Sequence, residues 1–151
     1  ISSLETKRVI EENGGIKLFL LIMLFDYILA FTSIGLAGFA PRFCKTQVSS
    51  VAVGSLIGLF ARYICHTLSG FLFFGDYAEW FFGEQVPWGG WFLSTFHGKV
   101  LSLVYSIVYN GLYMIPEMIL TAVVGGILAK ALSKQIAANR TNIAPKALRN
   151  A

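Results

Sequence analysis

Charged side chains are scarce in this chain. They make up 13% of its 151 residues, whereas a soluble domain has about a quarter. Hydrophobic residues make up 56% of the chain, and its mean hydropathy is +0.67. This composition excludes an ordinary water-soluble domain. It predicts an all-α integral membrane helical bundle, with the lipid bilayer as its surroundings.

Cysteine is also rare, and several chemical motifs are missing. Cys44 lies in a short basic turn and Cys65 in an apolar segment, a placement that fits neither a disulfide framework nor a metal site. The sequence lacks the P-loop motif, the H-E-x-x-H zinc motif and the G-x-S-x-G motif of serine hydrolases. We therefore expect free thiols and no metal-binding residues, and nothing in the sequence indicates nucleotide hydrolysis, zinc chemistry or a serine nucleophile.

Long apolar segments dominate what remains. A bilayer core of about 30 Å requires about 20 helical residues. The segments that meet this length are residues 16–41, 47–74 and 98–133. We expect one transmembrane domain over residues 16–134, preceded by a polar segment at 1–15 and followed by a basic tail at 135–151. Residues 54–58 form a G-x-x-x-G, for which helix packing is the favoured interpretation. Pro116 should kink or divide the third span.

The distribution of charge predicts a topology. Basic residues without acids mark the cytoplasmic side of a membrane, and both the connection "RFCKTQ" and the basic tail have this character. The loop at 75–97 carries acids, no lysine or arginine, and all three tryptophans. We expect this loop outside the cell, at the aromatic interface. The first span then starts outside, which calls for further helices upstream, and the chain is interpreted as the carboxy-terminal part of a longer cell-membrane protein.

Four ionisable side chains lie inside the apolar segments. Each costs about 2.5 to 3.5 kcal/mol at the centre of a bilayer, so such residues are functional candidates. They are Asp26, Arg62, His66 and Glu117. Arg62 and His66 are one helical turn apart on a single face, which Gly70 and Phe74 continue. The sequence predicts a stripe with a cation, an imidazole, an open space and an aromatic plate.

Further polar groups are expected at a similar depth. Tyr27 follows Asp26 in the first span, and Tyr105 precedes Asn110 in the third. If the three helices are antiparallel neighbours, these groups converge on one apolar pocket of the kind that binds a small ligand. An acid beside tyrosines and a flat aromatic ring suits a cation with a ring system.

Other interpretations stay open at this point. Asp26 and Arg62 could form a buried ion pair that only joins two helices, and Asn110 could be an interhelical hydrogen-bonding group. Glu117 could satisfy backbone donors near the proline. Alternatively, Asp26, His66 and Glu117 could form the relay of a proton-coupled carrier.

The order of four segments adds a family resemblance. The segments "FDY", "SIGLAGF", "ARYICHTLSGFLFFGDYA" and "VYSIVYNG" resemble the thiamine-specific substrate-binding (S) subunits of energy-coupling factor (ECF) transporters, the ThiT/YuaJ family. The resemblance extends from about Phe25 to Leu132. It implies the carboxy-terminal part of a six-helix protein that captures thiamine outside the cell. The implied partners are a transmembrane coupling subunit and two cytoplasmic ATPases, with no cofactor and no nucleic acid. The resemblance also implies that the protein is not an enzyme and has no catalytic residues. A subunit for another vitamin or precursor is the alternative.

The resemblance also implies a set of binding residues. These are Asp26, Tyr27, Arg62, His66, Phe74, Tyr105 and Asn110. Asp26 and Asn110 would orient the aminopyrimidine, while His66 and Phe74 would stack on it and the two tyrosines would contact the rest of the ligand. Three positions depart from the family, since Asp26 replaces a glutamate, Arg62 a lysine and Phe74 a tryptophan.

Overall fold

The computed structural model describes residues 15–143, and within this range every regular element is a helix. Three helical segments are long and apolar enough to cross a membrane. They are Ile16–Arg42, Gln47–Phe73 and Gly98–Ser133, whose ends lie within one residue of the expected spans. The protein is therefore an all-α membrane helical bundle. Residues 1–14, and residues 144–151 at the end of the expected basic tail, lie outside the described range.

The first span changes its helical type along its length. Its four consecutive stretches are α2 (Ile16–Met23), the π-helix η1 (Leu24–Leu29), α3 (Ala30–Ser33) and the 3-10 helix η2 (Ile34–Arg42). π-Turns are rare and often accompany functional sites. Here the π-turn contains Asp26, a feature that no residue pattern in the sequence announced.

The central helix is α4 (Gln47–Phe73), which begins at a capping box. The Thr46 hydroxyl accepts a bond from the Ser49 backbone at 3.1 Å, and the Ser49 hydroxyl accepts one from the Thr46 backbone at 3.3 Å. Two glycines of α4 face the first span, because a Cβ at Gly54 or Gly58 would lie 2.9 Å from a backbone oxygen of η2. The structure thus supports the packing interpretation of the G-x-x-x-G.

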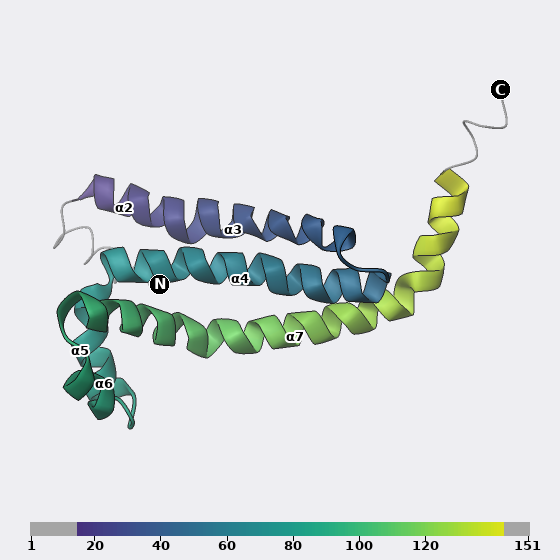
Figure 1. The fold of residues 1–151 in the computed structure, drawn as a ribbon. Helices are drawn as coiled ribbons and strands as arrows, with labels where there is room; N and C mark the ends of the chain where they lie inside the picture. Colours follow the sequence, from purple (N-terminus) through teal and green to yellow (C-terminus); the bar gives the residue numbers. More distant parts are fainter. Residues whose placement is uncertain (1–14, 144–151) are drawn as a thin grey trace.

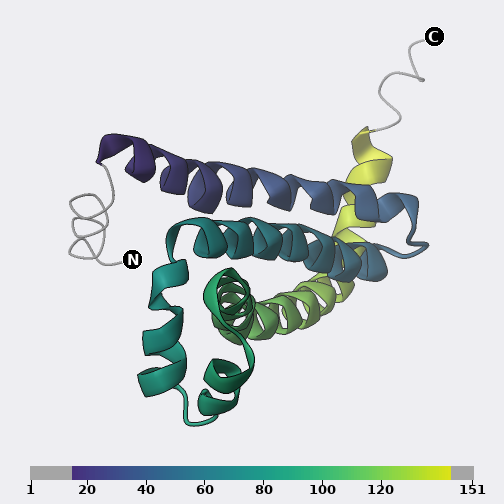
Figure 2. The ribbon, with the colours of Figure 1, turned by 60° about the vertical axis from the view of Figure 1, so that its left-hand side comes forward.

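The third long helix, α7 (Gly98–Ile143), lies on the other side of α4 (Figures 1 and 2). It runs through Pro116 without interruption, so the expectation that this proline could divide the span is wrong. The helix curves along the bundle, and its carboxy-terminal part, yellow in Figure 1, turns away from the other two helices. The three spans therefore form a layer with α4 in the middle rather than a closed ring around one hollow.

A helical hairpin at residues 75–97 connects α4 to α7. Its elements are η3 (Gly75–Tyr77), α5 (Ala78–Trp80), the π-helix η4 (Phe81–Gln85) and α6 (Gly90–Thr95). The hairpin projects from one end of the layer, as Figure 2 shows. Its inner side chains and the first turns of α7 form what we call the aromatic cluster: Ala78, Phe81, Phe82, Leu101 and Tyr105, with Phe74 among the residues packed against it.

Candidate functional site

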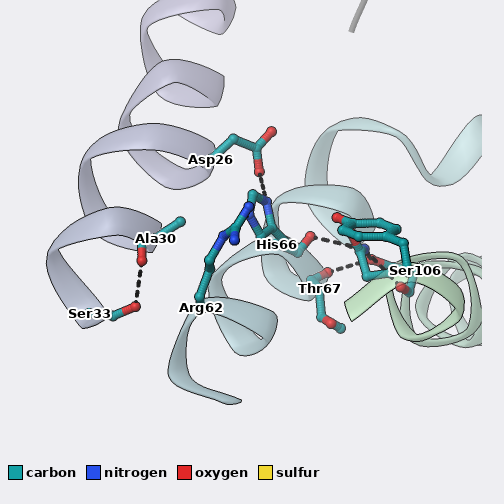
Figure 3. A network of polar contacts seen from close by, with 9 residues as sticks. Asp26, Ala30, Ser33, Arg62, His66, Thr67 and Ser106 are labelled. Atoms are coloured by element: carbon teal, nitrogen blue, oxygen red, sulfur yellow. Dashed lines mark hydrogen bonds and ion pairs between the residues drawn. The ribbon is translucent and has the colours of Figure 1, made fainter. Parts of the chain in front are cut away.

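Four ionisable side chains form a continuous chain of contacts across the layer. Oδ1 of Asp26 on η1 lies 3.0 Å from Nδ1 of His66 on α4 (Figure 3). Nε of Arg62, one turn earlier on α4, donates to Nε2 of His66 at 3.3 Å. Nη1 of Arg62 also donates to Oε1 of Glu117 on α7 at 2.8 Å. We call these four residues the polar chain, which links all three spans.

The contacts of the polar chain determine which nitrogen of His66 carries the proton. An arginine side chain has only donors, so Nε2 of His66 accepts the bond from Arg62. The proton of the neutral ring then sits on Nδ1 and is donated to Asp26. The imidazole is therefore a neutral bridge between a guanidinium and a carboxylate. Asp26 and Arg62 both contact His66, so the structure has this bridge in place of the direct ion pair that was the alternative interpretation.

Burial differs along the polar chain. The side chains of Asp26 and His66 are 12% and 13% exposed, whereas that of Glu117 is 38% exposed. The guanidinium carbon of Arg62 lies 5.1 Å from the centre of the Phe31 ring, a distance at which the ring face attracts a cation. The polar chain is thus shielded on the side of the first span and more open where it reaches α7.

Asn110 belongs to a second group of hydrogen bonds, between α4 and α7. Its Nδ2 donates to the backbone oxygen of Ser106 at 2.8 Å and to that of His66 at 3.3 Å. Its Oδ1 accepts a bond from the hydroxyl of Tyr113 at 2.6 Å. The Ser106 hydroxyl donates to the backbone oxygen of Thr67 at 2.7 Å, as drawn in Figure 3. These contacts support the interpretation of Asn110 as an interhelical hydrogen-bonding group that holds α4 at His66.

The space expected beside Gly70 is filled. A Cβ at this position would collide with the hydroxyl of Ser106 and would lie 3.3 Å from Nδ2 of Asn110. Gly70 therefore allows α7 to approach α4 closely, which is what brings the Asn110 amide to the His66 backbone. The expectation of open space on this stripe is wrong, because a neighbouring helix occupies it.

Phe74 and Tyr105 lie in a different place from the polar chain. The ring of Tyr105 packs 5.3 Å from that of Phe81 inside the aromatic cluster, and Phe74 packs against the same cluster. Phe74 lies about 12 Å from His66 along the axis of α4, at a rise of 1.5 Å per residue. The structure separates these two residues from the polar chain, contrary to the expected single pocket. The hairpin after α4 covers the face of α7 on which Tyr105 stands.

Tyr27 faces outward although its neighbour Asp26 faces α4. It is 46% exposed, and its ring stacks on that of Phe31 at 6.5 Å. Consecutive residues of a helix point in different directions, and here Asp26 points to His66 on α4 while Tyr27 packs along its own helix. Tyr27 consequently lies outside the polar chain.

Two members of this region were missed as site residues. The sequence suggests for Glu117 either a hydrogen bond to backbone donors near Pro116 or a place in a proton relay. It suggests no role for Phe31. The available signal was the depth of Glu117 in the third span, but nothing in the sequence pairs it with Arg62, which is 55 residues away.

The matched family supplies the identification. Residues 10–86, about half of the chain, match the model of the family described as "Thiamine transporter protein (Thia_YuaJ)". The chain belongs to this thiamine transporter family. It is 36% identical over 112 residues to the thiamine transporter ThiT of Bacillus subtilis (strain 168), an alignment that covers 68% of this chain and 48% of that protein. The chain thus spans about half the length of this curated relative. No solved structure matches it significantly.

Membership of the thiamine transporter family confirms the resemblance found in the sequence. The matched range contains Asp26, Arg62 and His66, three of the four members of the polar chain. Glu117, the fourth member, lies beyond that range. The polar chain therefore joins residues inside the segment that the family model matches to one outside that segment.

Proposed function

We propose that this protein is a membrane-embedded thiamine-binding subunit of an ATP-driven ECF vitamin transporter. Its partners would be a transmembrane coupling subunit and two cytoplasmic ATPases, and its basic tail would face the cytoplasm. One observation carries the proposal. A protein of the thiamine transporter family holds a largely shielded acid and histidine in direct contact between two apolar spans. Such groups are kept at membrane depth when they serve a ligand or an ion.

The chemistry of thiamine fits the polar chain. Thiamine has a cationic thiazolium ring and an aminopyrimidine ring, so its recognition needs a negative charge and hydrogen-bonding groups. His66 occupies one oxygen of the Asp26 carboxylate, and the second oxygen provides an acceptor for the aminopyrimidine. The carboxylate also balances the positive charge of the ligand. Arg62 acts on His66 and Glu117 rather than on the ligand, because like charges repel.

The remaining ligand contacts stay predictions. Tyr27, Phe74 and Tyr105 contact thiamine only if the ligand, or a further part of the transporter, extends from the polar chain to their present positions. Asn110 acts through the backbone of His66, to which its amide is bonded. The proposal therefore rests on Asp26 and His66.

A proton-coupled carrier is less compatible with this geometry. A relay from Asp26 through His66 to Glu117 would pass through Arg62, which lies between His66 and Glu117. The guanidinium has no acceptor and keeps its protons in proteins, so it interrupts such a relay. We expect thiamine uptake to persist when the proton gradient is collapsed with ATP held constant. Loss of uptake under these conditions would favour the carrier.

Isothermal titration calorimetry on the protein in lipid nanodiscs tests the proposal. Thiamine should bind with a stoichiometry of one, and riboflavin, biotin and pyridoxal should give no heat. Binding of another vitamin in place of thiamine would reassign the protein to a sister subunit. If none of the four binds, the polar chain serves assembly alone and the proposal is wrong.

A further inference from the structure

The charges of the polar chain do not cancel. Asp26 and Glu117 are carboxylates, Arg62 is a guanidinium, and the contacts of His66 make its ring neutral. Two negative groups therefore face one positive group, and one negative charge is left over. An unbalanced charge between membrane spans is costly. A ligand with a permanent positive charge would remove this cost on binding.

Glu117 determines which carboxylate of the polar chain lacks a direct counterion. Its Oε1 lies 2.8 Å from Nη1 of Arg62, so it takes the guanidinium as a direct ion-pair partner. Arg62 reaches Asp26 only through the neutral ring of His66. The Phe31 ring, 5.1 Å from the guanidinium carbon, adds a second attraction that does not involve Asp26. Without the charge of Glu117, Asp26 would be the remaining carboxylate of the polar chain to balance Arg62.

We infer that Glu117 is a positioning residue that sets the charge of the binding site: by pairing with Arg62, it leaves the Asp26 carboxylate to balance a cation. This inference rests on the proposed thiamine binding and specifies its substrate class. Ligands with a fixed positive charge are preferred over neutral molecules of the same shape. Glu117 itself does not need to touch the ligand.

A series of charge variants tests this assignment. Glu117→Gln leaves the guanidinium and one carboxylate, so the remaining charges cancel. Arg62→Gln leaves two carboxylates, and the double variant R62Q/E117Q leaves Asp26 alone, with the same net charge as the original protein. The two ligands are thiamine and a neutral analogue in which a thiophene ring replaces the thiazolium. The measured quantity is the ratio of their dissociation constants from calorimetry in nanodiscs.

We expect Glu117→Gln to weaken thiamine binding roughly tenfold, the usual size of a nearby charge effect, and to leave the neutral analogue within about twofold. The double variant should restore the preference for thiamine, because Asp26 is again without a counterion. Glu117→Asp keeps the charge and should keep the preference. Glu84→Gln is the matched control, since it removes the same charge from an exposed position on the hairpin. It should change the dissociation constant of neither ligand.

Glu117→Gln could weaken the binding of thiamine and of the neutral analogue equally. That result would overturn the inference, because the loss of a purely structural contact affects a charged and a neutral ligand alike. Failure of the double variant to restore the preference would overturn it as well. If Glu117→Gln does not fold, as judged by its chromatographic profile in detergent, Glu117→Asp and the double variant still decide. Absence of thiamine binding by the unmodified protein would instead defeat the proposed function, and the inference with it.

Discussion

The polar chain joins the three spans, whereas the aromatic cluster joins the hairpin to α7, and the two regions do so by different means. The polar chain uses three directional contacts of 2.8 to 3.3 Å between partly exposed ionisable side chains. The aromatic cluster uses ring contacts such as the stacking of Phe82 on Phe92 at 4.6 Å, and Phe82 is only 1% exposed. The comparison indicates that the cluster supports the fold, while the charges of the polar chain serve a ligand under the proposed function. Substitutions in the two regions should therefore have different consequences.

The largest effect is expected in the aromatic cluster. Phe82→Ala removes a buried ring and should lower the free energy of unfolding by about 3 to 5 kcal/mol. The measurement is reversible unfolding in mixed detergent micelles. Trp91→Ala, which removes an exposed ring from the same hairpin, is the control. Selective loss of thiamine binding by a stably folded Phe82→Ala protein would erase the distinction between the two regions.

The largest effect on ligand binding is expected at Asp26. Asp26→Asn removes the charge but keeps an oxygen for the Nδ1 proton of His66. Thiamine should bind roughly a hundredfold more weakly, within the range for loss of an adjacent opposite charge, and unfolding should change by less than about 1 kcal/mol. Calorimetry and micelle unfolding measure the two quantities. A large loss of stability with unchanged affinity would place Asp26 with the structural residues.

Asn110 lies on α7 between Tyr105 of the aromatic cluster and Glu117 of the polar chain, and a substitution there sharpens the comparison. Asn110→Leu removes the bonds of the amide to the Tyr113 hydroxyl and to the His66 carbonyl, so the free energy of unfolding should fall by about 1 to 2 kcal/mol. The dissociation constant for thiamine should stay within about twofold if Asn110 acts only between helices. A tenfold weaker binding at unchanged stability would show that the amide contacts the ligand, as the family resemblance implied.

The smallest effect is expected on the outer surface of the hairpin. All three tryptophans lie there, so tryptophan fluorescence reports on this segment alone. If the hairpin lies at the membrane interface, lipids brominated near the headgroup should quench the emission more than lipids brominated at the chain ends. Full quenching by acrylamide in water, with none by either lipid, would place the hairpin in solution instead.

Local patterns in the sequence were sufficient for the spans and for one contact of the polar chain. The ends of the apolar segments predicted the three long helices, because helix length follows from bilayer thickness. The spacing of Arg62 and His66 predicted that they share a face, since residues four apart are neighbours on any α-helix.

Contacts between distant segments were not predictable in the same way. The pair of Arg62 and Glu117 depends on the side on which α7 packs against α4. The burial of Tyr105 depends on where the hairpin folds back, and the loss of space at Gly70 depends on how closely α7 approaches. Each of these features involves two segments, whereas hydrophobic periodicity describes one segment at a time.

The sequence by itself determined that this protein is a helical membrane protein of the thiamine transporter family, because composition, span length and motif order are properties of the chain alone. The tertiary structure decided which polar groups meet. It joined Asp26, His66, Arg62 and Glu117 and placed Phe74 and Tyr105 elsewhere. The physical reason is that a buried charge needs a partner within a few ångströms, and only the packing of the helices brings such partners together.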